Sequence, residues 1–260
     1  MDYRTLRVRR QPEGLRVVID RPEADNGIND TLMSELHAVL DLAESDPELR
    51  LVVLEGAGPV FCSGMDFADA ARGTGDGGAL PAARGGQVFY DLLKRFTTTR
   101  RIVVSVVDGR VTGGGVGLAA ASDFVYATGR SSFALPEALW GLLPACVAPF
   151  LVRRVGFQPA YAMTMSTLPV TAERAARMQL VDELTENAEP LVRRLAARLT
   201  KIDDSVLADG KRYFARMWLP QEPLERAAVD EFSRLMDSPV VQRRITGFAD
   251  HRRMPWESAG

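Results

Sequence analysis

Three consecutive glycines, Gly113–Gly115, separate an apolar run from a segment rich in alanine, and this pattern predicts a strand, a tight turn and a helix. The first turn of a helix leaves backbone N–H groups without partners inside the helix, and the helix dipole favours negative charge there. Glycine carries no side chain, so the carbonyl of a thioester could lie directly against this backbone. The residues could therefore stabilise the negative oxygen of an enolate.

An oxyanion hole of this kind needs a second N–H donor from another strand end. The stretch "FCSGMDF", residues 61–67, follows the apolar run 51–60 and has the same order of strand, glycine and helix. Two such junctions that face a common cleft would supply both donors.

The glycines also allow two other interpretations. Residues 115–120 match the dinucleotide-binding pattern G-x-G-x-x-A, and Glu137 follows about 20 residues later, as that pattern requires. However, Glu137 comes directly after Pro136 instead of ending a strand. Tight packing of a helix against a strand is the third interpretation, because glycine also allows close backbone approach.

The elements that must position these residues are read from periodicity and from turn residues. A hairpin is predicted over 5–10 and 14–22, and a helix begins at Asp30–Thr31. Further elements follow in order: a buried strand at 49–56, a glycine-rich loop at 71–86, a helix near 87–96, and strands at 102–107, 123–128 and 131–135. Helices dominate from 147 to 248, so the expected class is α/β with a helical second half.

Composition narrows the kind of protein. A chain of 260 residues with 46% hydrophobic content can bury a large core, and a net charge of -2 argues against nucleic-acid binding. Neither a signal peptide nor a membrane span of ~18 apolar residues is expected, so we predict a cytoplasmic protein. Cys62 and Cys146 are expected to be buried thiols. His37 and His251 are expected at the surface, and no metal site is predicted.

Five stretches, in the same order along the chain, resemble the enoyl-CoA hydratase/isomerase (crotonase) superfamily. They are residues 19–30, 51–70, 106–128, 131–145 and 245–257. The resemblance implies an α/β fold in which repeated ββα turns form a spiral core over 1–195. It also implies a C-terminal helical trimerisation region over 196–260, and hence a homotrimer or hexamer.

The resemblance also assigns roles to residues. Met65 and Gly114 would supply the two oxyanion N–H groups, and Glu137 falls on the second catalytic glutamate of the hydratases. Tyr90 lies in a region that lines the acyl pocket in the superfamily, where it could relay a proton, bind the substrate hydroxyl or simply pack in the core. The pantetheine arm of the substrate would pass Ala24, Met65, Asp66, Phe67 and Ala68. Asp66 is equally expected to cap the following helix.

The chain departs from the hydratases at Gly117, where they carry another glutamate. Glu137 alone would then remove the α-proton and return a proton to the departing hydroxyl, which is a syn elimination. Gly117 would also leave room for a substrate branched at the β-carbon. This combination resembles the dehydratases of polyketide β-branching, which convert 3-hydroxy-3-methylglutaryl-acyl carrier protein to the 3-methylglutaconyl form before a decarboxylase of the same superfamily acts.

The resemblance implies no cofactor, because the substrate arrives on the phosphopantetheine of an acyl carrier protein or of CoA. An acidic carrier protein would need arginines nearby, and the sequence offers two clusters: Arg4, Arg7, Arg9 and Arg10, and Arg243, Arg244, Arg252 and Arg253. Two alternatives remain open. One is a general enoyl-CoA hydratase or isomerase acting on a CoA thioester, and the other is a non-catalytic family member that serves as an assembly subunit.

Overall fold

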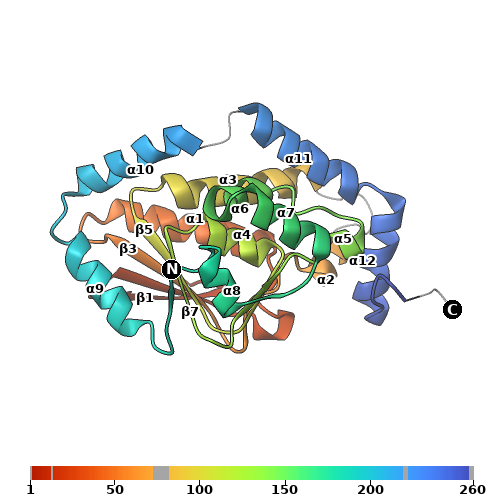
Figure 1. The fold of residues 1–260 in the computed structure, drawn as a ribbon, viewed down its shortest axis with the longest axis horizontal. Coiled ribbons are helices and arrows are strands. Elements are labelled where there is room, and N and C mark those ends of the chain that lie inside the picture. The colour runs from red at the N-terminus through yellow and green to blue at the C-terminus, as the bar shows by residue number, and fades with distance from the viewer. Residues whose placement is uncertain (1, 13, 73–81, 219–221, 258–260) are drawn as a thin grey trace.

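The computed structural model describes residues 2–12, 14–72, 82–218 and 222–257 (Figure 1). Of the glycine-rich loop predicted over 71–86, residues 73–81 lie outside this description. Residues 82–86 are helical, because helix α3 (Ala82–Thr98) begins before the predicted position.

Two sheets form the centre of the molecule, and successive turns of the chain contribute one strand to each. The first sheet has the order β1-β2-β3-β5-β7-β10, and the second has the order β4-β6-β8-β9. The strands of the first sheet are β1 (Leu6–Gln11), β2 (Gly14–Ile19), β3 (Leu51–Gly56), β5 (Ile102–Val107), β7 (Phe124–Ala127) and β10 (Glu183–Leu184). Those of the second are β4 (Val60–Cys62), β6 (Arg110–Thr112), β8 (Ser132–Ala134) and β9 (Val170–Thr171).

The pairing of these strands confirms the expected spiral. The three pairs β3–β4, β5–β6 and β7–β8 each follow one another directly in the chain, and neighbours within each sheet pair in parallel. The antiparallel exceptions are the predicted hairpin β1–β2 and the pair β8–β9. Because parallel strands end at the same edge of a sheet, the chain returns repeatedly to one rim.

Helices cover both faces of the first sheet, as Figure 1 shows. The helices not yet named are η1 (Pro22–Ala24), α1 (Asp30–Ser45), α2 (Phe67–Arg72), α4 (Gly114–Ala121), α5 (Glu137–Trp140), α6 (Ala148–Val155), α7 (Phe157–Ser166), α8 (Ala172–Arg177), α9 (Glu189–Leu199), α10 (Asp204–Trp218), α11 (Glu222–Met236) and α12 (Pro239–His251). Helix α1 begins at Asp30, within the predicted start. Its N-cap is the preceding residue, Asn29, whose side chain accepts a hydrogen bond from the N–H of Leu32 at 3.0 Å.

Strand β3 shows why an uninterrupted apolar run was the correct signal for a strand buried on both faces. Val52 and Leu54 belong to the main core, whereas Leu51 and Val53 belong to a second core on the other face. Helix α9 completes that second core, and the predicted domain boundary at residue 195 falls inside this helix.

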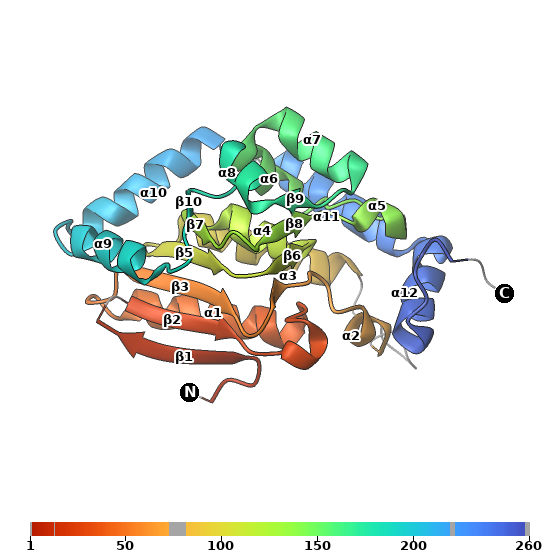
Figure 2. The same cartoon turned by 60° about the horizontal axis from the view of Figure 1, so that its bottom comes forward.

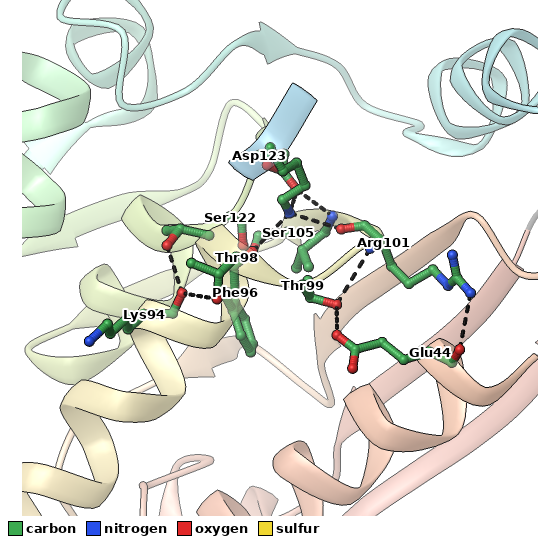
Figure 3. Close-up of polar contacts among 12 residues, drawn as sticks. Glu44, Lys94, Phe96, Thr98, Thr99, Arg101, Ser105, Ser122 and Asp123 are labelled. Carbon is green, nitrogen blue, oxygen red and sulfur yellow. Dashed lines mark hydrogen bonds and ion pairs between the residues drawn. The ribbon is translucent and has the colours of Figure 1, made fainter. Parts of the chain in front are cut away.

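A buried polar network holds helix α10 against this sheet. The Lys211 ammonium donates to the carbonyl oxygens of Phe96 at 2.9 Å and Arg101 at 2.8 Å, and it pairs with the Asp123 carboxylate at 2.6 Å. Figure 3 labels three of the residues involved, Phe96, Arg101 and Asp123. Asp123 also accepts from the N–H of Val103 at 2.7 Å. The Asp123 carboxylate thus joins helix α10 and strand β5 to its own segment of the chain.

Removing the charge at Lys211 should weaken the fold. We expect Lys211→Met to lower the free energy of unfolding by about 3 kcal/mol, because the substitution leaves the Asp123 carboxylate without its buried cation. Urea denaturation measures the change. Lys201→Met, at an exposed position, is the control and should change the free energy by less than about 0.5 kcal/mol. Equal effects of the two substitutions would show that the network contributes nothing.

The last two helices cover the end of the molecule opposite to α9. Figures 1 and 2 place α12 beside α2 and α5, and α11 lies along α3. Among the residues that the structure describes, no helix has the length and hydropathy needed to cross a bilayer.

Candidate active site

The two glycine-containing junctions predicted from the sequence lie against each other. Strands β4 and β6 are parallel neighbours, so the segments that leave their carboxyl ends are adjacent. A Cβ atom on Gly64 would lie 2.9 Å from the backbone nitrogen of Gly114 and 3.0 Å from the carbonyl oxygen of Thr112. Gly64 also has a φ of +83°, which side chains disfavour. Glycine is therefore required at this position by both the contact and the conformation.

The backbone N–H of Met65 points away from the neighbouring chain segment. Residues 28 and 65 form a parallel bridge in which Ile28 donates to the carbonyl of Gly64 at 2.7 Å, and Asp66 donates to the carbonyl of Ile28 at 3.0 Å. Because successive N–H groups of an extended chain alternate in direction, the N–H of Met65 faces the opposite side. No described residue accepts a hydrogen bond from it.

The N–H of Gly114 is also unused by the described residues. Gly114 is the first residue of α4, and the bonds that close the first turn of the helix come from Val116 and Gly117 to the carbonyl of Gly113. The three glycines thus have different roles. A Cβ on Gly115 would lie 2.5 Å from the carbonyl oxygen of Cys62, so this glycine serves close packing of α4 on β4.

Glu137 places a carboxyl group beside these amides. It is the first residue of α5, and a Cβ on Gly113 would lie 3.2 Å from its Oε1 atom. Its Oε2 atom is buried and has no hydrogen-bond partner among the described residues, although part of the residue remains exposed. Burial raises the pKa of the Glu137 carboxyl to about 7. The dinucleotide-binding interpretation fails here, because Glu137 lies against Gly113 and does not end a strand.

The raised pKa predicts how activity depends on pH. Proton removal needs the carboxylate form, so kcat/KM should fall about tenfold per pH unit below pH 7 and level off above it. Initial rates with one thioester substrate from about pH 5 to about pH 9 measure this profile. A flat profile across the neutral range would mean that another group removes the proton.

The expected pantetheine-binding residues flank one glycine. A Cβ on Gly27 would lie 3.1 Å from the carbonyl oxygen of Ala24 and 3.1 Å from the Cβ of Asp66. The Asp66 side chain accepts from the N–H of Asp69 at 3.0 Å and pairs with Arg21 at 2.7 Å, so it caps α2, as predicted. Ala68 follows in the first turn of α2 and is partly exposed.

Phe67 belongs to an aromatic cluster that joins three helices. Its ring centroid lies 4.8 Å from that of Trp140 in α5 and 6.2 Å from that of Phe248 in α12. The rings of Trp140 and Phe248 are 5.3 Å apart. The C-terminal helix thus packs directly onto the segment that follows Met65. Sequence patterns could not reveal this contact between distant parts of the chain.

The structure places Phe89, and not Tyr90, against the oxyanion glycine. A Cβ on Gly114 would lie 2.9 Å from Ile28 Cδ1 and 3.2 Å from Phe89 Cζ. Tyr90 is fully buried, its ring lies 5.3 Å from that of Phe150, and its hydroxyl has no hydrogen-bond partner among the described residues. Burial also raises the pKa of the Tyr90 hydroxyl above its ordinary value. Core packing, one of the roles considered for Tyr90, is the one these contacts support.

The room expected at Gly117 is already filled. A Cβ on this residue would lie 2.9 Å from Val147 Cγ2, 3.2 Å from Leu93 Cδ1 and 3.5 Å from Phe89 Cζ. Glycine is needed here so that these apolar side chains can pack on α4. The position does lack a carboxylate, as the sequence indicated, but it does not form an open space for a substrate branch.

Cys62 and Cys146 are buried, as predicted, and burial raises the pKa of each thiol to about 12. No cluster of three or more His, Cys, Asp and Glu residues with metal-binding geometry occurs within the described ranges. A surface cleft of about 520 Å³ contains none of the predicted site residues, and Arg110 and Arg130 line it.

Comparison with known proteins agrees with this geometry. The chain is 33% identical over 255 residues to the bacillaene synthase dehydratase PksH of Bacillus subtilis, covering 98% of this chain and 97% of that protein. It is 30% identical over 241 residues to the carnitinyl-CoA dehydratase of Escherichia coli, covering 92% and 83% of the two chains. A crystal structure from Bacillus subtilis, described as that of a polyketide biosynthesis enoyl-CoA hydratase, superposes with a TM-score of 0.90 at 32% identity and covers 98% of this chain and 100% of that one.

The sequence profile of enoyl-CoA hydratase/isomerase matches residues 12–259. The relatives are named as dehydratases and hydratases, which are hydro-lyases, and this agrees with the enzyme class predicted from the sequence. The spiral of paired strands, the relatives and the profile match lead to the same conclusion: the chain belongs to the enoyl-CoA hydratase/isomerase family.

Proposed function

We propose that this protein removes water from 3-hydroxy-3-methylglutaryl-acyl carrier protein to give the 3-methylglutaconyl form in polyketide β-branching. The resemblance to a bacillaene synthase dehydratase over nearly the whole chain supports the reaction class. One observation carries the mechanism: the Glu137 carboxyl lies beside the adjacent segments that follow β4 and β6, where the N–H groups of Met65 and Gly114 have no acceptor among the described residues.

In the first step, the Glu137 carboxylate takes the proton from the α-carbon of the thioester. The electron pair of that C–H bond moves toward the carbonyl, and the enolate oxygen accepts hydrogen bonds from the amides of Met65 and Gly114. These donors are preorganised by the β4–β6 pairing and by the start of α4, so they do not have to reorient as charge develops.

In the second step, the enolate collapses and the bond between the β-carbon and the hydroxyl breaks. Glu137, now protonated, gives its proton to the departing hydroxyl, which leaves as water, and the carboxylate is regenerated. A pKa of about 7 suits a group that must act first as base and then as acid near neutral pH. Gly117 offers no second carboxylate, so one group has to do both.

This reaction uses only the chain and its thioester. The partners it implies are an acyl carrier protein and a decarboxylase of the same superfamily that uses the product. Mass spectrometry of the acyl group after incubation with enzyme tests the proposal, and the expected result is loss of one water from the carrier-bound substrate. If the substrate stays intact while crotonyl-CoA is hydrated rapidly, the protein is instead a general hydratase.

A further inference from the structure

The arginines near the C-terminus lie on and just after helix α12, which packs against α2 and α5. Arg243 and Arg244 lie on α12, whereas Arg252 and Arg253 follow it, and Trp256 lies in the next turn. We call these five residues the C-terminal basic patch. Among the described residues, none of its arginines has an ion-pair partner.

The other arginine cluster differs in this respect. On strand β1, Arg7 pairs with Asp20 at 2.9 Å and Arg10 pairs with Asp46. Its charge is therefore partly neutralised by the protein itself. Strand β1 also lies far from α12 in both views of the molecule (Figures 1 and 2).

The C-terminal basic patch is connected to the proposed site through the aromatic cluster. The Arg252 guanidinium lies over the ring of Phe248, 5.4 Å from its centroid, and Phe248 contacts Phe67 and Trp140. A Cβ on Gly141, the residue that ends α5, would lie 3.0 Å from Arg244 Nη1. The patch therefore borders α2, which follows the Met65 amide, and α5, which carries Glu137.

The composition of the patch fits a protein surface better than a phosphate group. Trp256 is 64% exposed, and its near neighbour in the chain, Met254, is 38% exposed. Large apolar side chains therefore accompany the four arginines. Arginine and tryptophan are the residues that contribute most often to binding energy in protein interfaces. A phosphate would pair with the arginines but would leave these apolar surfaces uncovered.

Resting on the proposed function, we propose that the C-terminal basic patch docks an acidic surface of the acyl carrier protein. Docking at this place would hold the carrier beside α2 and α5, from which the phosphopantetheine arm can pass the Met65 segment. Charge complementarity of this kind acts mainly on the rate of association and is weakened by salt.

The test uses the double variant Arg243→Glu/Arg253→Glu, because neither side chain makes a contact that the fold needs. The substrates are the 3-hydroxy-3-methylglutaryl thioesters of the carrier protein, of CoA and of pantetheine. We expect kcat/KM for the carrier-linked substrate to fall at least tenfold at low salt and the difference to shrink as salt is added. Turnover of the pantetheine thioester should be unchanged.

The double variant Arg9→Glu/Arg198→Glu is the matched control, since it makes the same charge change at exposed positions on β1 and α9, far from α12, and it should leave the turnover of all three substrates unaffected. An equal loss with this control, or no loss in the Arg243→Glu/Arg253→Glu variant, would overturn the docking surface. The docking surface would also be overturned if kcat/KM for the CoA thioester fell as much as kcat/KM for the carrier-linked substrate. That result would show that the patch binds the phosphates of the CoA nucleotide. If the unaltered enzyme dehydrates none of the three thioesters, the proposed function itself is wrong.

Discussion

Glu137→Gln lowers kcat for dehydration by about 10²–10⁴-fold, which is the usual contribution of a general acid–base group. The amide is close in size to the carboxyl but can neither take the α-proton nor return one to the hydroxyl. Gly117 carries no carboxylate that could take over the proton transfer. Single-turnover measurements with the carrier-linked substrate separate this effect from slow product release.

The Glu137→Gln variant should gain thermal stability although it loses activity. Burial raises the pKa of Glu137 in the folded state above its ordinary value, so the native protein binds this proton more tightly than the unfolded chain does. The stability from this group is complete below the unfolded pKa and is lost as pH rises to about 7. Above that pH the glutamine variant should therefore unfold at a higher temperature than the unaltered protein.

Glu173→Gln provides the matched control, because Glu173 is also a glutamate in the first turn of a helix but is exposed. We expect its substitution to leave the dehydration rate unchanged. If Glu137→Gln retained full activity, the single-carboxyl mechanism would have to be abandoned.

Gly64→Ala lowers kcat/KM by about 10²–10³-fold, comparable to the removal of one oxyanion donor. The added methyl group would meet the Gly114 nitrogen at 2.9 Å and the Thr112 carbonyl oxygen at 3.0 Å. Both are backbone atoms, so the two junctions would have to move apart. The N–H of Gly114 would then no longer point to the same position as that of Met65.

The loss must be separated from the strain of placing alanine at positive φ, which costs about 1–2 kcal/mol. Gly58→Ala is suited to this purpose, because Gly58 has a φ of +76° but a Cβ there would meet nothing within 4 Å. Both variants should lose stability in thermal denaturation, whereas only Gly64→Ala should lose activity. Similar activities in the two variants would disprove the role given to the contact between residues 64 and 114.

Local patterns predicted much of the fold and the centre of the site. Alternation of apolar and polar residues located the β1–β2 hairpin, and the uninterrupted apolar run located β3, because burial on one or both faces has a direct pattern in sequence. The glycines around residues 64 and 114 indicated close backbone contact. The structure shows this contact between the two segments that follow the parallel strands β4 and β6. Glu137 was found through its match to the family.

Contacts between distant segments left no such pattern. Ile28 and Phe89 reach Gly114 from a loop and from α3, and neither has a distinctive sequence context. Gly117 was interpreted from the carboxylate that is missing at this position. The structure shows that apolar side chains fill the space beside it, among them Val147 from the segment that follows α5. The contact between Phe248 and Phe67 likewise depends on how α12 packs against α2.

The measurement that tests the central claim most directly is a crystal structure of the Glu137→Gln variant with the intact 3-hydroxy-3-methylglutaryl-pantetheine thioester bound. The thioester carbonyl oxygen should lie about 2.7–3.1 Å from the backbone nitrogens of both Met65 and Gly114, with the side chain of residue 137 next to the α-carbon. A carbonyl oxygen bound by other donors, or an α-carbon out of contact with residue 137, would contradict the account.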